Sequence, residues 1–173
     1  MRELTVRTRQ TFACSASTVW SLMCNSRMDD TTTLLFKLGV PQPVQCRVVD
    51  GKGGVGGERE CISDQGVVHQ RILVWMPEKC LAFRMESTNM NFRKYVRDIA
   101  DTFELVATTA GVVATRTTRV STQGRSQFFR RLPLFVSLKQ VHRYVFRNWE
   151  RLARKGTTTP SVLESGSASA PTV

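Results

Sequence analysis

The hydrophobic period of the sequence changes near residue 125, and this change most constrains the fold. From Val44 to Thr122, apolar and polar residues alternate in short runs separated by turn residues, which is typical of strands with one buried face. From residue 125 to residue 155, apolar residues recur at three- and four-residue intervals, which predicts one long amphipathic helix. Its apolar stripe comprises Leu134, Leu138, Val141, Val145, Trp149 and Leu152. An antiparallel sheet with one apolar face must be covered, and this helix is the only amphipathic element large enough to cover it.

Seven strands and two short helices precede the long helix. The expected strands span residues 3–13, 44–50, 58–64, 67–76, 79–87, 93–107 and 112–122. A short helix begins at Ser15 or Ser17, either of which can accept a hydrogen bond from the first turn, and a second spans residues 28–38. Pro133 interrupts the helical pattern, so Ser126–Leu132 is expected to form a separate turn or a kinked lead-in. The predicted fold class is α+β, with a curved seven-stranded antiparallel sheet wrapped around the C-terminal helix and two short helices closing one end.

Length and composition favour one soluble domain. The chain has 173 residues, of which 41% are hydrophobic and 23% charged, as in ordinary globular proteins. We assign residues 1–155 to the folded domain and residues 156–173, rich in Thr, Ser, Ala and Pro, to a disordered low-complexity tail. No apolar run approaches the roughly 18 to 20 residues of a membrane span, and the first residues lack the apolar core of a signal peptide. We therefore expect a cytoplasmic protein; nothing in the sequence predicts an oligomeric state.

Cysteine and histidine counts argue against a metal centre. The five cysteines are odd in number and form no C-x-x-C pair, so neither a zinc site nor a disulfide framework is expected. Most of them are expected to be small buried apolar side chains. With only His69 and His142, a His-rich metal site is also excluded, and the run Gly51–Gly57 lacks the Lys-Ser/Thr ending of a phosphate-binding loop. The sequence therefore predicts no cofactor and no metal.

The net charge of +11 is concentrated in the long helix. Residues 125 to 155 hold nine Lys and Arg residues against one acidic residue. Four of them recur at i, i+4 spacing beside the apolar stripe: Lys139, Arg143, Arg147 and Arg151. Such a row is usually a solvated face, and the alternative is a surface for the anionic headgroups of a membrane. Nucleic acid is an unlikely partner, because the aromatic residues of this helix are used by the packing stripe instead of being interleaved with the basic ones.

Four segments carry a resemblance to a known superfamily. They are Phe12–Leu22, Val55–Glu60, Ile72–Phe83 and the Phe103–Leu105 and Gly111–Thr115 arms of the last predicted hairpin. Together with the order of elements, they resemble the START/Bet v 1-like (SRPBCC) superfamily and, within it, the polyketide cyclase/dehydrase-like branch. The resemblance implies a helix-grip fold enclosing a cavity for an apolar small molecule that is aromatic, polyketide or lipid-like. It leaves open two alternatives: a cyclase or aromatase using general acid–base catalysis, and a peripheral membrane or lipid-transfer protein using the basic helix.

The two-residue alternation of each strand predicts which side chains line such a cavity. Counting by twos from clear apolar positions places three groups inside: Leu81, Phe83 and Met85; His69, Arg71, Leu73 and Trp75; and Tyr95, Arg97, Ile99, Asp101, Phe103 and Leu105. The last strand adds Ala114, Arg116, Thr118 and Val120. The helix contributes its stripe, including Val141, Val145 and Trp149. Charged groups in an apolar wall must pair with one another or meet a polar ligand.

Three interpretations of these inward charges stay open. In the first, arginines orient a carboxylate, phenolate or keto-enol group, and His69 and Asp101 are candidate catalytic residues for proton transfer. In the second, the charges form an internal Arg–Asp network. In the third, a β-bulge reverses the alternation so that some of them reach solvent. The predicted ligand-binding residues are Arg71, Trp75, Phe83, Met85, Tyr95, Arg97, Ile99, Phe103, Arg116, Val141, Val145 and Trp149.

Overall fold

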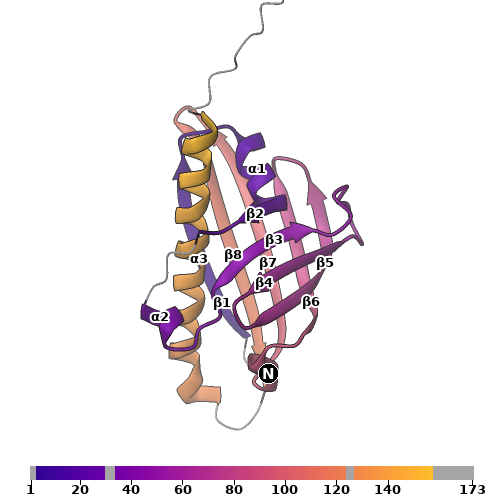
Figure 1. Ribbon diagram of the computed structural model, residues 1–173, viewed down its shortest axis with the longest axis vertical. Coiled ribbons are helices and arrows are strands. Elements are labelled where there is room, and N and C mark those ends of the chain that lie inside the picture. Colours follow the sequence, from indigo (N-terminus) through magenta and orange to yellow (C-terminus); the bar gives the residue numbers. More distant parts are fainter. Residues whose placement is uncertain (1–2, 30–33, 124–126, 158–173) are drawn as a thin grey trace, which may run out of the picture.

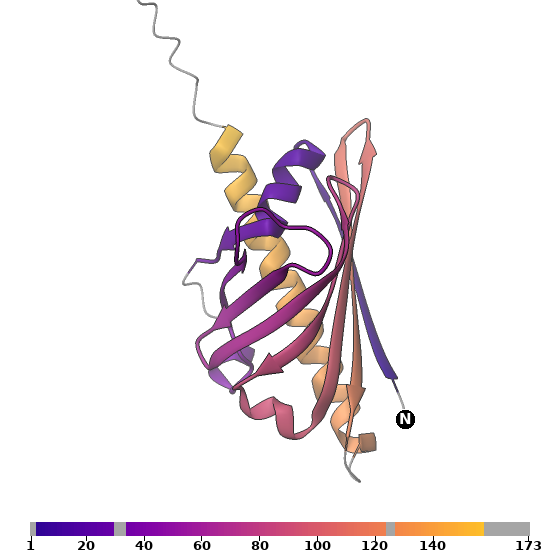
Figure 2. The same cartoon turned by 90° about the vertical axis from the view of Figure 1, so that its right-hand side faces the viewer.

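A curved antiparallel sheet wraps around one long C-terminal helix in the computed structural model, which describes residues 3–29, 34–123 and 127–157 (Figures 1 and 2). Within these residues the sheet has eight strands. They are β1 (Glu3–Phe12), β2 (Asn25–Arg27), β3 (Pro43–Val48), β4 (Glu58–Ser63), β5 (Gly66–Met76), β6 (Cys80–Thr88), β7 (Val96–Thr108) and β8 (Gly111–Thr122). The seven predicted strands are all present. The eighth, β2, is three residues long, which is too short to produce a readable alternation.

The strands form one antiparallel sheet in the order β1-β8-β7-β6-β5-β4-β3-β2. Strands β3 to β8 follow the chain as a meander, while β1 pairs with β8 along its whole length, from Glu3 opposite Ser121 to Phe12 opposite Val112. The inward side chains of β1 alternate as the sequence predicts, with Leu4, Val6 and Phe12 buried. The helix-grip α+β architecture is therefore confirmed.

The two short helices lie at different levels along the long helix (Figure 1). Helix α1 (Ala16–Cys24) begins as expected, with the Ser15 hydroxyl accepting a hydrogen bond from the backbone N–H of Thr18 at 3.2 Å. Helix α2 (Leu34–Lys37) occupies the end of the predicted segment 28–38, of which residues 30–33 lie outside the described residues. The ring of Phe36 in α2 packs edge-on against Tyr144 of the long helix, 4.9 Å between centroids.

The long helix α3 (Gln127–Thr157) passes through Pro133 without a break in the helical assignment. The expectation of a separate turn before Pro133 is therefore wrong, and the segment from Gln127 to Leu132 is a helical lead-in. Pro133 is the seventh residue of the helix, so it removes one intrahelical hydrogen bond and crowds the carbonyl four residues earlier, and the helix continues through it at that cost. The helix runs two residues past the predicted boundary at 155, and residues 158–173 of the predicted tail lie outside the described residues.

A short 3₁₀ helix, η1 (Asn91–Lys94), replaces the first residues of the strand predicted at 93–107. Consequently β7 starts at Val96. In Figure 1, η1 lies at the same end of the sheet as the N-terminal end of α3.

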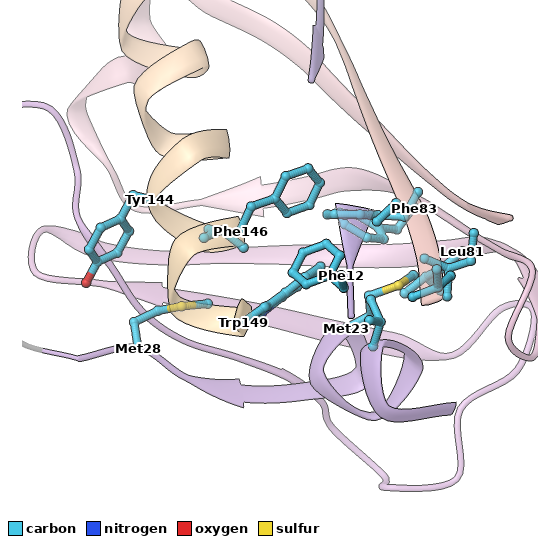
Figure 3. Packing of buried hydrophobic residues seen from close by; sticks show 14 of the residues in the cluster. Phe12, Met23, Met28, Leu81, Phe83, Tyr144, Phe146 and Trp149 are labelled. Carbon is cyan, nitrogen blue, oxygen red and sulfur yellow. The ribbon is translucent and has the colours of Figure 1, made fainter. Parts of the chain in front are cut away.

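Aromatic side chains fill the half of the interior next to α1 (Figure 3). Phe12, Phe83, Phe103, Phe146 and Trp149 are each at most 2% exposed. Phe146 lies edge-on to Phe12 at 5.7 Å and 5.6 Å from Trp149, and Trp149 lies 5.5 Å from Phe103. Such ring pairs add to the free energy gained from burial. These five residues are called the aromatic core below.

One disulfide corrects the cysteine prediction. Cys46 of β3 and Cys61 of β4 are joined, and they are directly opposed across the β3–β4 ladder. Spacing along the chain could not reveal the pair, because the hairpin register is what brings residues 15 apart face to face. The other three cysteines, Cys14, Cys24 and Cys80, are free and partly buried.

The described residues form neither a metal-binding cluster nor a membrane-spanning helix. Within residues 3–29, 34–123 and 127–157, no cluster of three His, Cys, Asp or Glu side chains is placed to hold a metal ion. Across the same ranges, no helix is long and apolar enough to cross a membrane.

Candidate ligand-binding cavity

A cavity of about 320 Å³ occupies the half of the interior away from the aromatic core. Its walls are apolar side chains of the sheet and of the first half of α3: Val68, Val96, Ile99, Val120, Leu134, Leu138 and Val141. Met90 and Phe92, around the start of η1, and the segment from Gly39 to Pro41 after α2 also line it. The cavity therefore lies between the sheet and the N-terminal half of α3.

A layer of polar side chains separates the cavity from the aromatic core. This polar belt consists of Arg59, Gln70, Asp101, Arg116, Thr118 and His142. On one side, the guanidinium carbon of Arg59 lies 4.3 Å from the centroid of the Phe83 ring, and that of Arg116 lies 5.1 Å from the Phe103 ring. On the other side, four of its members line the cavity: Gln70, Asp101, Arg116 and Thr118. An apolar ligand in the cavity would therefore meet the charged groups at this end, and Ser63 and Ser137 are the other polar side chains of the lining.

Asp101 of β7 is held as a carboxylate inside this belt. Arg116 Nε donates to its Oδ1 at 2.9 Å, and the Thr118 hydroxyl donates to the same oxygen. Burial by itself would raise the pKa of Asp101, but the charge and hydrogen bond of Arg116, with smaller contributions from His142 and Thr118, hold the pKa below its ordinary value. Asp101 is therefore ionised at neutral pH, and it cannot act as a proton donor there.

His142 of α3 continues the network to the edge of the sheet. Because Thr118 gives its only proton to Asp101, its oxygen must accept from His142 Nε2–H, 2.7 Å away. The other ring nitrogen, Nδ1, then accepts from the Thr8 hydroxyl at 3.0 Å. Burial, with the charge of Arg116 acting in the same direction, lowers the pKa of His142 to about 2, so the imidazole is neutral. This chain of hydrogen bonds ties α3 to β1, β8 and β7.

Arg59 of β4 has no carboxylate partner in the belt. It is 3% exposed, and its NH1 donates to Gln70 Oε1 at 2.5 Å. Its Nε is the one fully buried side-chain nitrogen or oxygen in the described part of the chain without a hydrogen-bond partner. Burial lowers the pKa of Arg59 to about 10, and the nearby charge of Arg116 acts in the same direction.

Eight of the side chains predicted to face the interior line the cavity, and four of them are among the predicted catalytic or ligand-binding residues. Asp101, Arg116, Ile99 and Val141 all face the cavity. The internal Arg–Asp network, one of the three interpretations left open, is present as the Arg116–Asp101 pair. What these residues do for a ligand stays a proposal.

Other predicted residues belong to the packed interior instead. Phe83, Phe103 and Trp149 are members of the aromatic core, and Val145 is buried beside them. Trp75 packs edge-on against Trp20 of α1, 5.0 Å between centroids. Met85, another predicted ligand-binding residue, is buried in the apolar cluster of Val96 and Val120, behind the cavity wall.

The predicted inward placement of His69, Arg71 and Leu73 is wrong. The β5–β6 register shifts between Ile72 and Val74, so counting back by twos from Trp75 lands on the outer face. Ile72 and Gln70 face inward instead. The His69 side chain is 51% exposed and lies 3.5 Å from Glu60, and Arg71 forms a 2.8 Å ion pair with Glu86. His69 and Asp101 are therefore on opposite faces of the sheet.

A second bulge corrects the placement of Arg97 and Tyr95. The β7–β8 register shifts between Val96 and Asp98, which turns Val96 inward and leaves Arg97 exposed. Tyr95 follows η1, precedes the strand and is also exposed. The bulge interpretation thus holds for His69, Arg71 and Arg97, while the ion-pair network holds for Asp101 and Arg116.

Three belt residues were not predicted: Gln70, for which the alternation indicated Arg71, and Arg59 and His142, for two other reasons. Arg59 lies in a strand whose two faces are both polar, so no apolar alternation marks its inward side. His142 was not included in the predicted apolar stripe of α3, although its spacing indicates the buried side. It lies four residues after Leu138 and three before Val145, which is the spacing of the buried stripe.

Comparisons with known proteins agree on the fold. No family model matches the chain, and no curated protein matches it either. Among solved structures, a START superfamily protein from Mycobacterium smegmatis superposes with a TM-score of 0.61 at 10% identity, covering 87% of this chain and 97% of that one. Major latex-like protein 151 from Panax ginseng gives 0.60 at 10% identity, covering 87% and 97%. Protein NE0264 from Nitrosomonas europaea gives 0.62 at 21% identity, covering 90% and 97%. The chain therefore has the helix-grip fold of the START/Bet v 1-like superfamily.

Proposed function

We propose that this protein binds an apolar small molecule in its internal cavity. The observation that carries the proposal is the cavity of about 320 Å³, with apolar walls and one polar end formed by Gln70, Asp101, Arg116 and Thr118. Its volume lies at the lower end of the range for ligand pockets, which favours a compact aromatic, polyketide or lipid-like molecule. The START/Bet v 1-like fold commonly accommodates small hydrophobic ligands, which supports the same function.

Binding is a better interpretation of the site than cyclase-type catalysis. The two groups first considered for proton transfer, His69 and Asp101, lie on opposite faces of the sheet. Asp101 has both of its hydrogen bonds on one oxygen and a lowered pKa, which makes it a weak base as well as a poor acid. Turnover of a polyketide analogue that Asp101→Asn abolishes would overturn this preference for binding.

The test of cavity binding is a matched pair of tryptophan substitutions on α3. Leu138→Trp places an indole in the cavity, whereas Leu132→Trp places one on an exposed part of the same helix. We expect the first substitution to weaken binding of the neutral fluorescent probe N-phenyl-1-naphthylamine by about tenfold or more, because the indole occupies the ligand's volume. We expect the second to leave binding unchanged. Equal affinity in both variants would contradict cavity binding, and extraction of a co-purified molecule would identify the natural ligand.

A second candidate function is delivery of the ligand at a membrane surface. Exposed apolar side chains adjoin the cavity-lining segments: Leu34 and Leu38 beside Gly39, and Leu132, Phe135 and Val136 around Leu134. Two residues of the basic row, Arg143 and Arg147, are exposed on the same helix. The other two have partners, since Lys139 donates to the Arg7 carbonyl and Arg151 pairs with Asp29.

Vesicle co-sedimentation tests this second function. We expect the wild type to sediment with vesicles containing anionic lipid, and Leu38→Ser combined with Leu132→Ser to reduce sedimentation. A wild-type protein that stays in the supernatant at low salt would remove this candidate and leave cavity binding unaffected.

A further inference from the structure

The polar belt carries an uncompensated positive charge. Arg116 is neutralised by Asp101, with which it shares a 2.9 Å ion pair. His142 is neutral, because both ring nitrogens are engaged in a fixed chain of hydrogen bonds with Thr8 and Thr118. Arg59 is the remaining charged member of the belt, and the acid that acts on it through space, Asp101, already serves Arg116.

The surroundings of Arg59 replace only part of its hydration. One face of the guanidinium lies on the Phe83 ring, and NH1 has the amide oxygen of Gln70. Nε has no acceptor at all. Buried guanidinium groups are ordinarily paired with a carboxylate, so this arrangement leaves a positive charge that an anion from outside the chain would balance.

Gln70 connects Arg59 to the cavity. Its side chain is buried and lines the cavity wall, while its Oε1 accepts from Arg59. A guanidinium can only donate, so it fixes the orientation of this amide and leaves the NH₂ group as the free end. The amide donors of Gln70 are therefore available to a ligand in the cavity. The charge of Arg59 lies behind them, joined to Gln70 by one hydrogen bond.

We propose that the ligand carries an oxyanion, such as a carboxylate, phenolate or enolate, which binds at the Gln70 end of the cavity and is held by the charge of Arg59. The proposal rests on the cavity-binding function above and adds the chemical class of the ligand. Arg59 acts through Gln70 as a positioning residue, while Gln70 makes the contact. Arg116 contributes less, because Asp101 already neutralises it.

The test compares two probes that differ by one anionic group. 1-Anilinonaphthalene-8-sulfonate carries a sulfonate, and N-phenyl-1-naphthylamine is the same aromatic body without it. For Arg59→Met we expect affinity for the anionic probe to fall about tenfold or more, the size of a lost charge-assisted interaction, and affinity for the neutral probe to change less than about twofold. Arg47→Met, which removes an exposed arginine on the neighbouring strand, is the matched control and should change neither.

Gln70→Glu provides a second and independent variant. The new carboxylate would pair with Arg59 inside the protein, so we expect a higher thermal midpoint and loss of anionic-probe binding together. If Gln70 only stabilised the fold, the higher thermal midpoint would not be accompanied by a loss of anionic-probe binding. This variant decides the question if Arg59→Met does not fold.

The outcomes separate the two proposals. If the wild type binds neither probe, cavity binding itself is wrong. If it binds both and Arg59→Met weakens both equally, cavity binding stands and the oxyanion proposal is overturned. The oxyanion proposal is overturned in the same way if Gln70→Glu leaves anionic-probe affinity unchanged.

Discussion

His142 is one of the residues through which polar contacts join the helix to the sheet. It is fully buried, accepts from Thr8 and donates to Thr118, so each ring nitrogen has one partner. The charged groups that act on it are Asp101, Arg116 and Lys139. Protonating Nδ1 would bury a charge beside Arg116 and take away the acceptor of the Thr8 hydroxyl proton, which explains why the neutral imidazole is favoured.

This neutral imidazole predicts a loss of stability in mild acid. The unfolded chain binds a proton at this histidine below a pH of about 6.5, whereas the folded protein does so only near the pKa of about 2. The contribution of the neutral His142 to the free energy of unfolding is therefore fully present above a pH of about 6.5. Below that pH it falls by up to about 1.4 kcal/mol per pH unit. We expect urea unfolding between pH 4.5 and 7.5 to show this slope in the wild type and to lose most of it in His142→Gln.

The exposed histidine is the control for that measurement. His69→Gln should keep the wild-type slope, because that side chain is 51% exposed on the outer face. The lowered pKa of Asp101 places its own titration below this pH range. Parallel slopes in the wild type and in His142→Gln would show that the buried imidazole is not the titrating group.

At the scale of the element, two bulges decide which face of a strand meets the cavity. The sequence was sufficient for the seven long strands, the Ser15 start of α1 and the stripe of α3, because each depends on a period or a cap that local residues create. The sequence did not predict which side chains face inward across the register shifts next to Ile72 and Val96, because a register shift depends on the neighbouring strand. Asp101 and Arg116 lie where the β7–β8 register is regular, so their inward placement was predicted correctly. Arg71 was predicted to face inward where Gln70 does, because β5 has a register shift.

The bulge in β5 makes a direct prediction for two adjacent residues. Ile72 is fully buried and Leu73 is about half exposed, although both are large and apolar. We expect Ile72→Ala to lower the free energy of unfolding by about 2 to 5 kcal/mol, and Leu73→Ala to change it by about 0.5 kcal/mol or less. Urea unfolding of the two variants provides the comparison, and a larger loss for Leu73→Ala would mean that the strand keeps its simple alternation.

At the scale of the whole molecule, packing and binding are divided between the two halves of the interior. The aromatic core fills the end covered by α1, and the cavity occupies the other end, with the polar belt between them. Close packing gives the first half its stability, since Phe103, Phe146 and Trp149 each contact at least two other rings. The second half keeps space for a ligand, and the side chains that α3 contributes to its wall, Leu134, Ser137, Leu138 and Val141, are smaller than the rings of Phe146 and Trp149.

This division predicts that stability and binding can be changed separately. Phe146→Ala empties a fully buried position among Phe12, Phe103 and Trp149, so we expect a loss of about 3 to 5 kcal/mol in the free energy of unfolding. Ile99→Ala enlarges a wall that already faces open space, so no new void must be closed and the loss should be smaller, about 2 kcal/mol or less. Titration with N-phenyl-1-naphthylamine should then show altered affinity in Ile99→Ala and wild-type affinity in the folded fraction of Phe146→Ala. Wild-type affinity in Ile99→Ala together with altered affinity in Phe146→Ala would mean that the ligand binds among the aromatic rings. The function would then lie in the half of the interior that the structure shows to be filled.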